Sequence, residues 1–196
     1  MSMAQFRRSL HDALFSIRKN PAFWFSLGAS QLLIHWSQDL VPYLGTLAAS
    51  VFSVWLMARS FDRNWLRKAR PLLGLGLLFF PLTGFWLILM SLYENSSLYG
   101  GLSIAWILPT LVLMAFGYLT LNQSVARVLN EDLSVDRALA LSWVHVTKRM
   151  PSYGACALFL TVIWGASIAT GGYGFWISVP YSMALLRAVE DSIVHA

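Results

Sequence analysis

Six stretches of the chain are each long and apolar enough to cross a lipid bilayer, and this limits the fold more than any other feature. Crossing about 30 Å of hydrocarbon takes roughly 20 mostly apolar residues in a helix. Lipid cannot hydrogen-bond to the backbone, so such a stretch must satisfy its backbone internally, as a helix does. The six windows are residues 22–38, 41–58, 72–92, 102–121, 152–170 and 173–189. The sequence therefore predicts an all-α, polytopic integral membrane protein whose 196 residues form a single membrane domain. Four spans plus two re-entrant segments is the alternative.

Composition indicates that lipid is the main solvent of this protein. Hydrophobic residues make up 57% of the chain and charged residues only 12%, whereas soluble domains carry roughly 45–50% and roughly 25%. The single cysteine, Cys156, excludes a disulfide within the chain.

Prolines support the boundaries of the windows. Proline is tolerated in the first turn of a helix, where its missing N–H would have had no partner. Four prolines stand at the start of a predicted span: Pro21, Pro42, Pro71 and Pro151. Three others lie inside the third, fourth and sixth spans, where each should free a carbonyl and bend its helix: Pro81, Pro109 and Pro180.

The fourteen Lys and Arg residues all fall on one side of the predicted topology. They lie in the N-terminal segment, in the connections at residues 59–71 and 122–151, and near the C-terminus, whereas the opposite connections carry only Asp39 and Glu94. Because short cytoplasmic loops retain Lys and Arg, this asymmetry predicts a multi-pass protein of the cell inner membrane with both termini cytoplasmic. It also explains the net charge of +5, because the basic residues would contact the lipid bilayer and its anionic headgroups. No nucleic acid is therefore expected as a partner.

Two amphipathic segments precede Pro21 and Pro151 and predict helices that lie in the inner interface. Each ends in basic residues and leads into a hairpin of two spans. This shared order predicts a parallel repeat of residues 3–59 and 132–187 about an axis along the membrane normal, with residues 72–121 inserted between. A coincidence of two similar hairpins is the alternative. The apolar faces hold Phe6, Leu10, Ala13, Leu14 and Ile17 in the first segment, and Val135, Leu139, Ser142, Trp143 and Val146 in the second.

The C-terminal third carries several short motifs. They are Asp132-Leu-Ser-Val-Asp-Arg-Ala138-Leu139, Ser142-Trp143, Gly172-Tyr-Gly174, Pro180 and Arg187-Ala-Val-Glu190-Asp191. Through them the chain resembles the YciC-like proteins and the membrane domain attached to some glycerophosphodiester phosphodiesterases, a group of bacterial six-span proteins. The chain departs from that group in having Arg187-Ala188 where a Tyr is expected, and no phosphodiesterase domain is expected in it. The resemblance implies a fold and a membrane location, with function unassigned.

Four polar residues of the first span, Gln31, His35, Gln38 and Asp39, share one helix face. Polar groups in hydrocarbon cost free energy without partners, so this face should turn inward or toward water. One interpretation is a lining for a proton or solute path, with His35 titrating near neutral pH. The interpretation that we favour is that the helix is leaving the membrane, since His35 lies about 20 Å along the helix from Ala22.

Arg59, Arg63, Arg67 and Arg70 recur at helical spacing. They predict that the second span continues as a helix with a basic stripe at the inner surface. Each such charge near an anionic leaflet contributes about 1 kcal/mol of attraction. Membrane orientation and lipid contact explain the stripe, and a protein partner is the alternative.

The remaining polar residues predict no chemistry. Asn122 and Gln123, at the end of the fourth span, are expected at the membrane interface. His145 has no second ligand three or four residues away, so no metal is expected there.

No segment carries a catalytic, metal-binding or nucleotide-binding pattern. The sequence therefore predicts a protein without cofactor that is not an enzyme and that acts by binding another membrane component. This would be an accessory or envelope factor, or an immunity protein against a pore-forming toxin. The alternative is a small transporter or channel-like carrier, which the near absence of charge within the spans disfavours.

Overall fold

Every regular element of the structure, a computed structural model that describes residues 3–40, 42–62, 64–81, 101–170 and 174–194, is helical. The all-α prediction is therefore confirmed for these residues. The helices are α1 (Met3–Lys19), α2 (Pro21–Leu40), α3 (Pro42–Phe61), the 3-10 helix η1 (Trp65–Lys68), α4 (Ala69–Leu78), α7 (Gly101–Asn130), α8 (Val135–Lys148), α9 (Met150–Ala169) and α10 (Phe175–Val194).

Two of the described helices are long and apolar enough to cross a membrane: Leu44–Phe61 within α3 and Trp106–Asn130 within α7. A third qualifies if Val135–Lys148 and Tyr153–Ala169 are taken as one span bent by 95°. The described residues thus support two or three spans, and the count of six stays a prediction.

Proline positions match the helix starts. Pro21 and Pro42 are the first residues of α2 and α3, and Pro151 is the second residue of α9. Pro109 and Pro180 lie inside α7 and α10, as expected. The local chemistry of proline therefore sets these boundaries as the sequence indicates.

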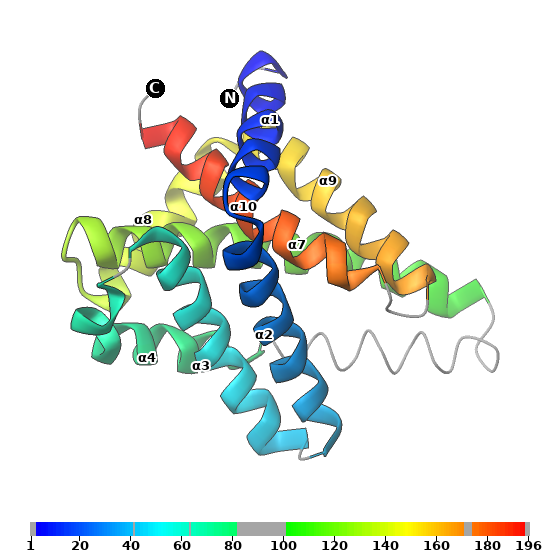
Figure 1. Cartoon of the computed structure of the whole chain (residues 1–196), viewed down its shortest axis with the longest axis horizontal. Coiled ribbons are helices and arrows are strands. Elements are labelled where there is room, and N and C mark those ends of the chain that lie inside the picture. Colours follow the sequence, from blue (N-terminus) through cyan, green and yellow to red (C-terminus); the bar gives the residue numbers. More distant parts are fainter. Residues whose placement is uncertain (1–2, 41, 63, 82–100, 171–173, 195–196) are drawn as a thin grey trace.

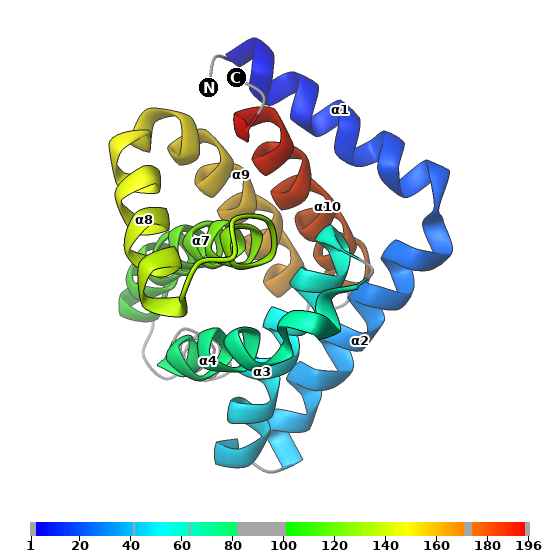
Figure 2. The ribbon, with the colours of Figure 1, turned by 90° about the vertical axis from the view of Figure 1, so that its left-hand side faces the viewer.

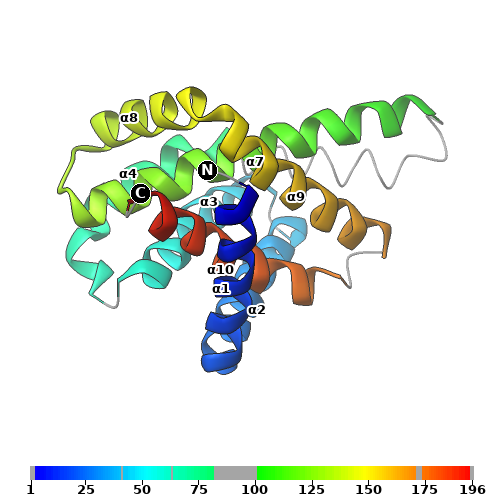
Figure 3. The same ribbon diagram turned by 90° about the horizontal axis from the view of Figure 1, so that it is seen from above.

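The helix α7 runs through the middle of the molecule. Figure 2 looks nearly along it and shows α8, α9, α10, α3 and α4 placed around it, and α7 contacts all five. The hairpin of α2 and α3 extends downward in Figure 1, whereas that of α9 and α10 extends to the right. Viewed from above, α8 runs beside the C-terminal part of α7 (Figure 3). Both units of the predicted repeat thus have an amphipathic helix followed by a hairpin, and their symmetry stays a prediction.

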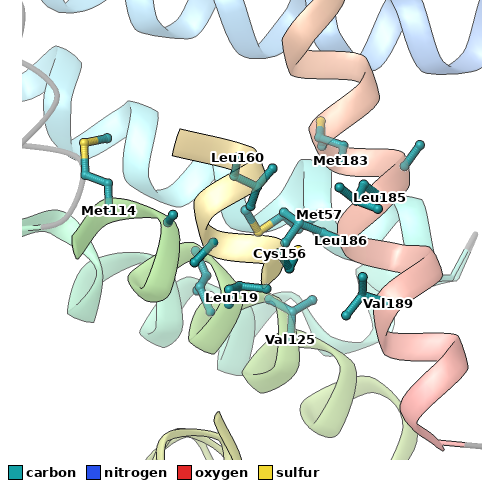
Figure 4. Close-up of a cluster of buried hydrophobic side chains, with 14 of the residues drawn as sticks. Met57, Met114, Leu119, Val125, Cys156, Leu160, Met183, Leu185, Leu186 and Val189 are labelled. Carbon is teal, nitrogen blue, oxygen red and sulfur yellow. The ribbon is translucent and has the colours of Figure 1, made fainter. Parts of the chain in front are cut away.

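The core lies where α3, α7, α9 and α10 meet (Figure 4). Met57 of α3, Val125 of α7 and Leu185 of α10 gather around Cys156 of α9, whose side chain is fully buried. Cys156 is therefore a small apolar residue of the core.

Hydrogen bonds between side chains join α9 to α10. Trp164 Nε1 donates to Ser182 Oγ at 3.0 Å, and Ser167 Oγ donates to Ser178 Oγ at 2.8 Å. All buried polar side chains among the described residues are Ser, Thr, Asn or Gln. This is the pattern by which helices associate in lipid, where small polar groups hydrogen-bond across close contacts.

Different helices approach each other closely at Gly28 and Gly76. A Cβ at Gly28 of α2 would lie 2.4 Å from Pro180 Cγ of α10. A Cβ at Gly76 of α4 would lie 2.6 Å from Val51 Cα of α3. Only glycine fits at these two helix crossings.

The predicted amphipathic helices α1 and α8 both form. In α1, Ala13 is fully buried and Phe6 packs edge-on against Phe159 of α9 at 6.0 Å between ring centroids. Leu14 of the predicted apolar face is instead 47% exposed. The apolar face of α1 therefore packs mainly against protein, chiefly α10.

The helix α8 buries Ala138, Ser142 and Val146, which are spaced by one turn, against α7. Trp143, predicted for the same face, is 57% exposed, and Leu141 and Val144 are also exposed. The helix therefore has two apolar surfaces, one buried in the protein and one facing outward.

Candidate functional site

The predicted polar face lies on the C-terminal half of α2. The backbone of Gln31, His35, Gln38 and Asp39 is helical there, whereas their side chains lie outside the described residues. Leu33, in the same half of the helix, is 60% exposed. A path along this face stays a prediction.

The predicted basic stripe does not lie on one helix. Arg59 is in the last turn of α3, Arg67 is in η1 and Arg70 is in α4, and all three are exposed. Arg63 lies outside the described residues. The expected continuation of the second span is wrong, because α3 ends at Phe61.

A turn at Asp62 is the reason that the helix stops. Asp62 Oδ1 accepts a hydrogen bond from the backbone N–H of Asn64 at 2.9 Å. Such bonds from Asp and Asn side chains compete with the helix and favour a turn. After the turn, the ring of Trp65 lies 5.6 Å from that of Trp55. The chain thus folds back beside α3.

An open pocket of about 890 Å³ lies beside this turn, between the junction of α1 with α2, the end of α3 and Arg187 of α10. We call it the basic pocket, because Lys19, Arg59 and Arg187 line it. No carboxylate is among the lining residues within the described part of the chain. Aromatic side chains supply much of the remaining wall: Phe23, Trp24, Phe61 and Trp65.

The junction of α1 with α2 forms one side of the basic pocket. Asn20 lies between the two helices, and its Oδ1 accepts a hydrogen bond from the backbone N–H of Phe23 at 3.3 Å. This is the bond by which Asn caps a helix N-terminus. Across the junction, Trp24 Nε1 donates to Ser16 Oγ at 3.0 Å. Figure 2 shows the resulting bend between α1 and α2, and Lys19 at the end of α1 lines the pocket.

Arg187 connects two of the helices that line the basic pocket, α10 and α3. It donates from Nη1 to the backbone carbonyl of Ser60, in the last turn of α3. A cation at a helix C-terminus satisfies a free carbonyl and complements the helix dipole. This bond fixes α10 against α3 at the pocket.

A second polar cluster lies where α7, α8 and α9 meet. Gln123 Nε2 donates to Tyr153 Oη, and the ring of His145 lies edge-on to that of Tyr153 at 6.0 Å. Asn122 Nδ2 donates to the carbonyl of Leu186 at 3.1 Å. Asn122 and Gln123, which are expected at the membrane interface, are both buried and hydrogen-bonded between helices, and their depth in the membrane stays a prediction.

His145 has an unusual environment in this cluster. Burial lowers the pKa of His145, and the positive charges of Arg149 and Arg127 lower it further. Its buried Nε2 has no hydrogen-bond partner among the described residues. No sequence signal predicts this environment of His145, since its contacts come from other helices. Within the described residues, no group of three His, Cys, Asp or Glu side chains gathers as a metal site would.

Comparison with known proteins yields no family model, no curated protein and no solved structure that matches this chain. The similarity to YciC-like proteins therefore stays a prediction from the short motifs.

Proposed function

We propose that the chain is a six-span protein of the cell inner membrane, with both termini in the cytoplasm, that acts by binding another membrane component. It would serve as an accessory or envelope factor, or as an immunity protein against a pore-forming toxin. Catalysis and cofactors have no part in the proposal.

The observation that carries the proposal is the apolar character of the outer surface. Each of α1, α2, α3, α4, α7, α8, α9 and α10 exposes at least two large apolar side chains. On α9, for example, Leu158 and Val162 lie one turn apart and are 60% and 68% exposed. Apolar surface on every helix supports contact with lipid or with other membrane helices, since water-soluble monomers rarely expose large contiguous apolar patches.

The angle between α8 and α9 supports the membrane orientation. The two helices meet at 95°, which is the geometry of a helix that lies in the interface plane and is followed by a span along the normal. The outward face of α8 fits this position, because it combines Leu141 and Trp143 with the exposed cations Arg137 and Lys148. Tryptophan is enriched at the headgroup level.

Two ends of the molecule differ in charge. In Figure 1, the end of α8 that leads into α9 and the C-terminal ends of α3, α7 and α10 lie toward the top and left. Arg59, Arg127 and Arg149 lie in these parts, and Arg187 lies about two turns before the end of α10. The junction of α9 with α10 and the N-terminal end of α7 lie to the right. This separation supports the proposed orientation with the basic ends in the cytoplasm.

Partner binding can be tested by substitutions on the outward face of α8. A photo-reactive amino acid in place of Trp143 should cross-link to the partner, which mass spectrometry would identify and reciprocal capture would verify. Trp143→Ala should then reduce capture of that partner by about tenfold or more, because buried Trp side chains are typical hot spots of binding. Trp106→Ala is the matched control, since Trp106 is also exposed but lies in the N-terminal half of α7 and not on α8.

The transport alternative predicts the opposite pattern. In that case Gln31→Leu together with His35→Leu would abolish movement of a solute or proton, with membrane insertion intact. Unchanged partner capture in Trp143→Ala, together with loss of function in the double variant, would contradict binding as the activity.

A further inference from the structure

The basic pocket brings together cations from three segments that are far apart in the sequence. Lys19 ends α1, Arg59 lies in the last turn of α3, and Arg187 lies in α10. We propose that this pocket is a binding site for a phosphate group, carried either by an anionic phospholipid or by a soluble phosphate ester. The phospholipid form rests on the proposed membrane location, whereas the phosphate chemistry does not.

Lys19 and Arg59 are the cations that are free to meet such a ligand. In the part of the chain that the structure describes, neither forms an ion pair. Cations nearby behave differently, since Lys68 pairs with Asp132 and Arg127 with Glu131. A pocket with three cations and no carboxylate on its described walls favours an anion.

Helix dipoles explain part of this arrangement, but not the pocket. Lys19 and Arg59 stand in the last turns of their helices, where a cation adds about 0.3–1 kcal/mol by complementing the dipole. Arg187 makes the corresponding bond to Ser60 directly. Stabilising helix ends does not require the three cations to surround one space of about 890 Å³, which lies within the range of roughly 300–1,000 Å³ of small-molecule sites.

The aromatic wall of the pocket suits the part of a ligand next to its phosphate. Trp24 is almost fully buried and held by Ser16, so its ring is fixed in place. Trp65 and Phe61 border the opposite side, and Leu66 beside them is 66% exposed. Cations next to aromatic rings match a phospholipid headgroup with its glycerol and first methylenes. They also match a small phosphate ester with a short carbon chain.

The test compares two double variants that lose the same charge. Lys19→Gln/Arg59→Gln removes the two free cations of the pocket, and Arg67→Gln/Arg70→Gln removes two exposed cations that do not line it. Lys19→Arg/Arg59→Lys keeps the pocket charge and checks that the site tolerates substitution. Circular dichroism and thermal unfolding in detergent show that each variant is folded.

Two arms distinguish the source of the phosphate. In the first, protein in detergent is titrated with phosphatidylglycerol or phosphatidylcholine, and bound lipid is counted by native mass spectrometry. In the second, glycerol 3-phosphate and inorganic phosphate are titrated by calorimetry at constant ionic strength. The original chain should bind phosphatidylglycerol or a soluble phosphate, and Lys19→Gln/Arg59→Gln should weaken that binding by about tenfold or more.

The control variants decide the result. The proposal predicts that Arg67→Gln/Arg70→Gln and Lys19→Arg/Arg59→Lys bind within about twofold of the original chain. Equal losses in both Gln double variants would mean general surface attraction, and no loss in either would mean that the cations only stabilise helix ends. Either outcome overturns the proposal. A chain that is soluble without detergent yet binds glycerol 3-phosphate through Lys19 and Arg59 would contradict the membrane proposal and support the phosphate site.

Discussion

Polar residues near the junction of α7, α8 and α9 owe their environment to packing and not to their own spacing. Gln123 belongs to the end of an apolar window, which indicates an interface position, yet its side chain is 1% exposed. The reason is that α7 continues to Asn130 and α8 folds back over it. Helical periodicity locates such a residue on a helix, whereas the partner that buries it lies elsewhere in the chain.

His145 should make the stability of the protein depend on pH. Its pKa in the folded protein lies below the ordinary value of 6.5, chiefly because burial disfavours the charged form. The stability that the neutral ring contributes is therefore complete above about pH 6.5, and it is lost as the pH falls from there through the lower folded pKa. His145→Gln should unfold at a temperature that changes less between about pH 7.5 and about pH 5.5.

Thermal unfolding in detergent at several pH values measures this effect. His11→Gln is the control, because the side chain of His11 is 79% exposed on α1. If the original chain and His145→Gln lose stability in parallel on acidification, the effect does not arise at His145.

Glycines at helix crossings set the distance between elements. Gly76→Ala should lower the free energy of unfolding by about 1–3 kcal/mol, because the new methyl group would meet the backbone of Val51. Gly154→Ala in α9 is the matched control, since nothing lies within 4 Å of the added Cβ. That change should be neutral or stabilise the helix by up to about 1 kcal/mol. Chemical or thermal unfolding in detergent compares the two, and equal effects would contradict the close contact of α3 with α4.

Local sequence signals located most helix ends, and their failures have local causes too. Pro21, Pro42 and Pro151 start helices as expected. Helical spacing from Arg59 to Arg70 predicts a longer helix than forms, because it takes no account of Asp62 and Asn64, which form the turn. Asp and Asn together are a readable turn signal, so this break could have been predicted.

The basic pocket could not have been predicted in the same way. Lys19 and Arg59 stand in the last turns of α1 and α3, whereas Arg187 lies about two turns before the end of α10, and no periodicity connects them. Their meeting depends on the close crossing of α2 with α10 at Gly28 and Pro180, and on the bond from Arg187 to Ser60. Such contacts arise from tertiary packing, and the spacing of residues along the sequence does not predict them.

The molecule as a whole exposes large apolar side chains on every described α-helix, and Arg59, Arg127 and Arg149 stand at the C-terminal ends of α3, α7 and α8. These two properties are what a membrane protein with a cytoplasmic basic side requires. They also define the position of the basic pocket, which would face the inner leaflet. The central claim is therefore the placement of the chain across the membrane.

Cysteine labelling of intact cells tests this placement most directly. Single cysteines replace Ser37, Ser97 or Ser134 in a Cys156→Ala background, which leaves the core apolar because Cys156 is fully buried. A membrane-impermeant maleimide should label the first two positions in sealed cells, and Ser134→Cys only after the cells are opened. Labelling of Ser134→Cys in sealed cells, as strong as that of Ser37→Cys, would contradict the six-span placement with its basic side in the cytoplasm.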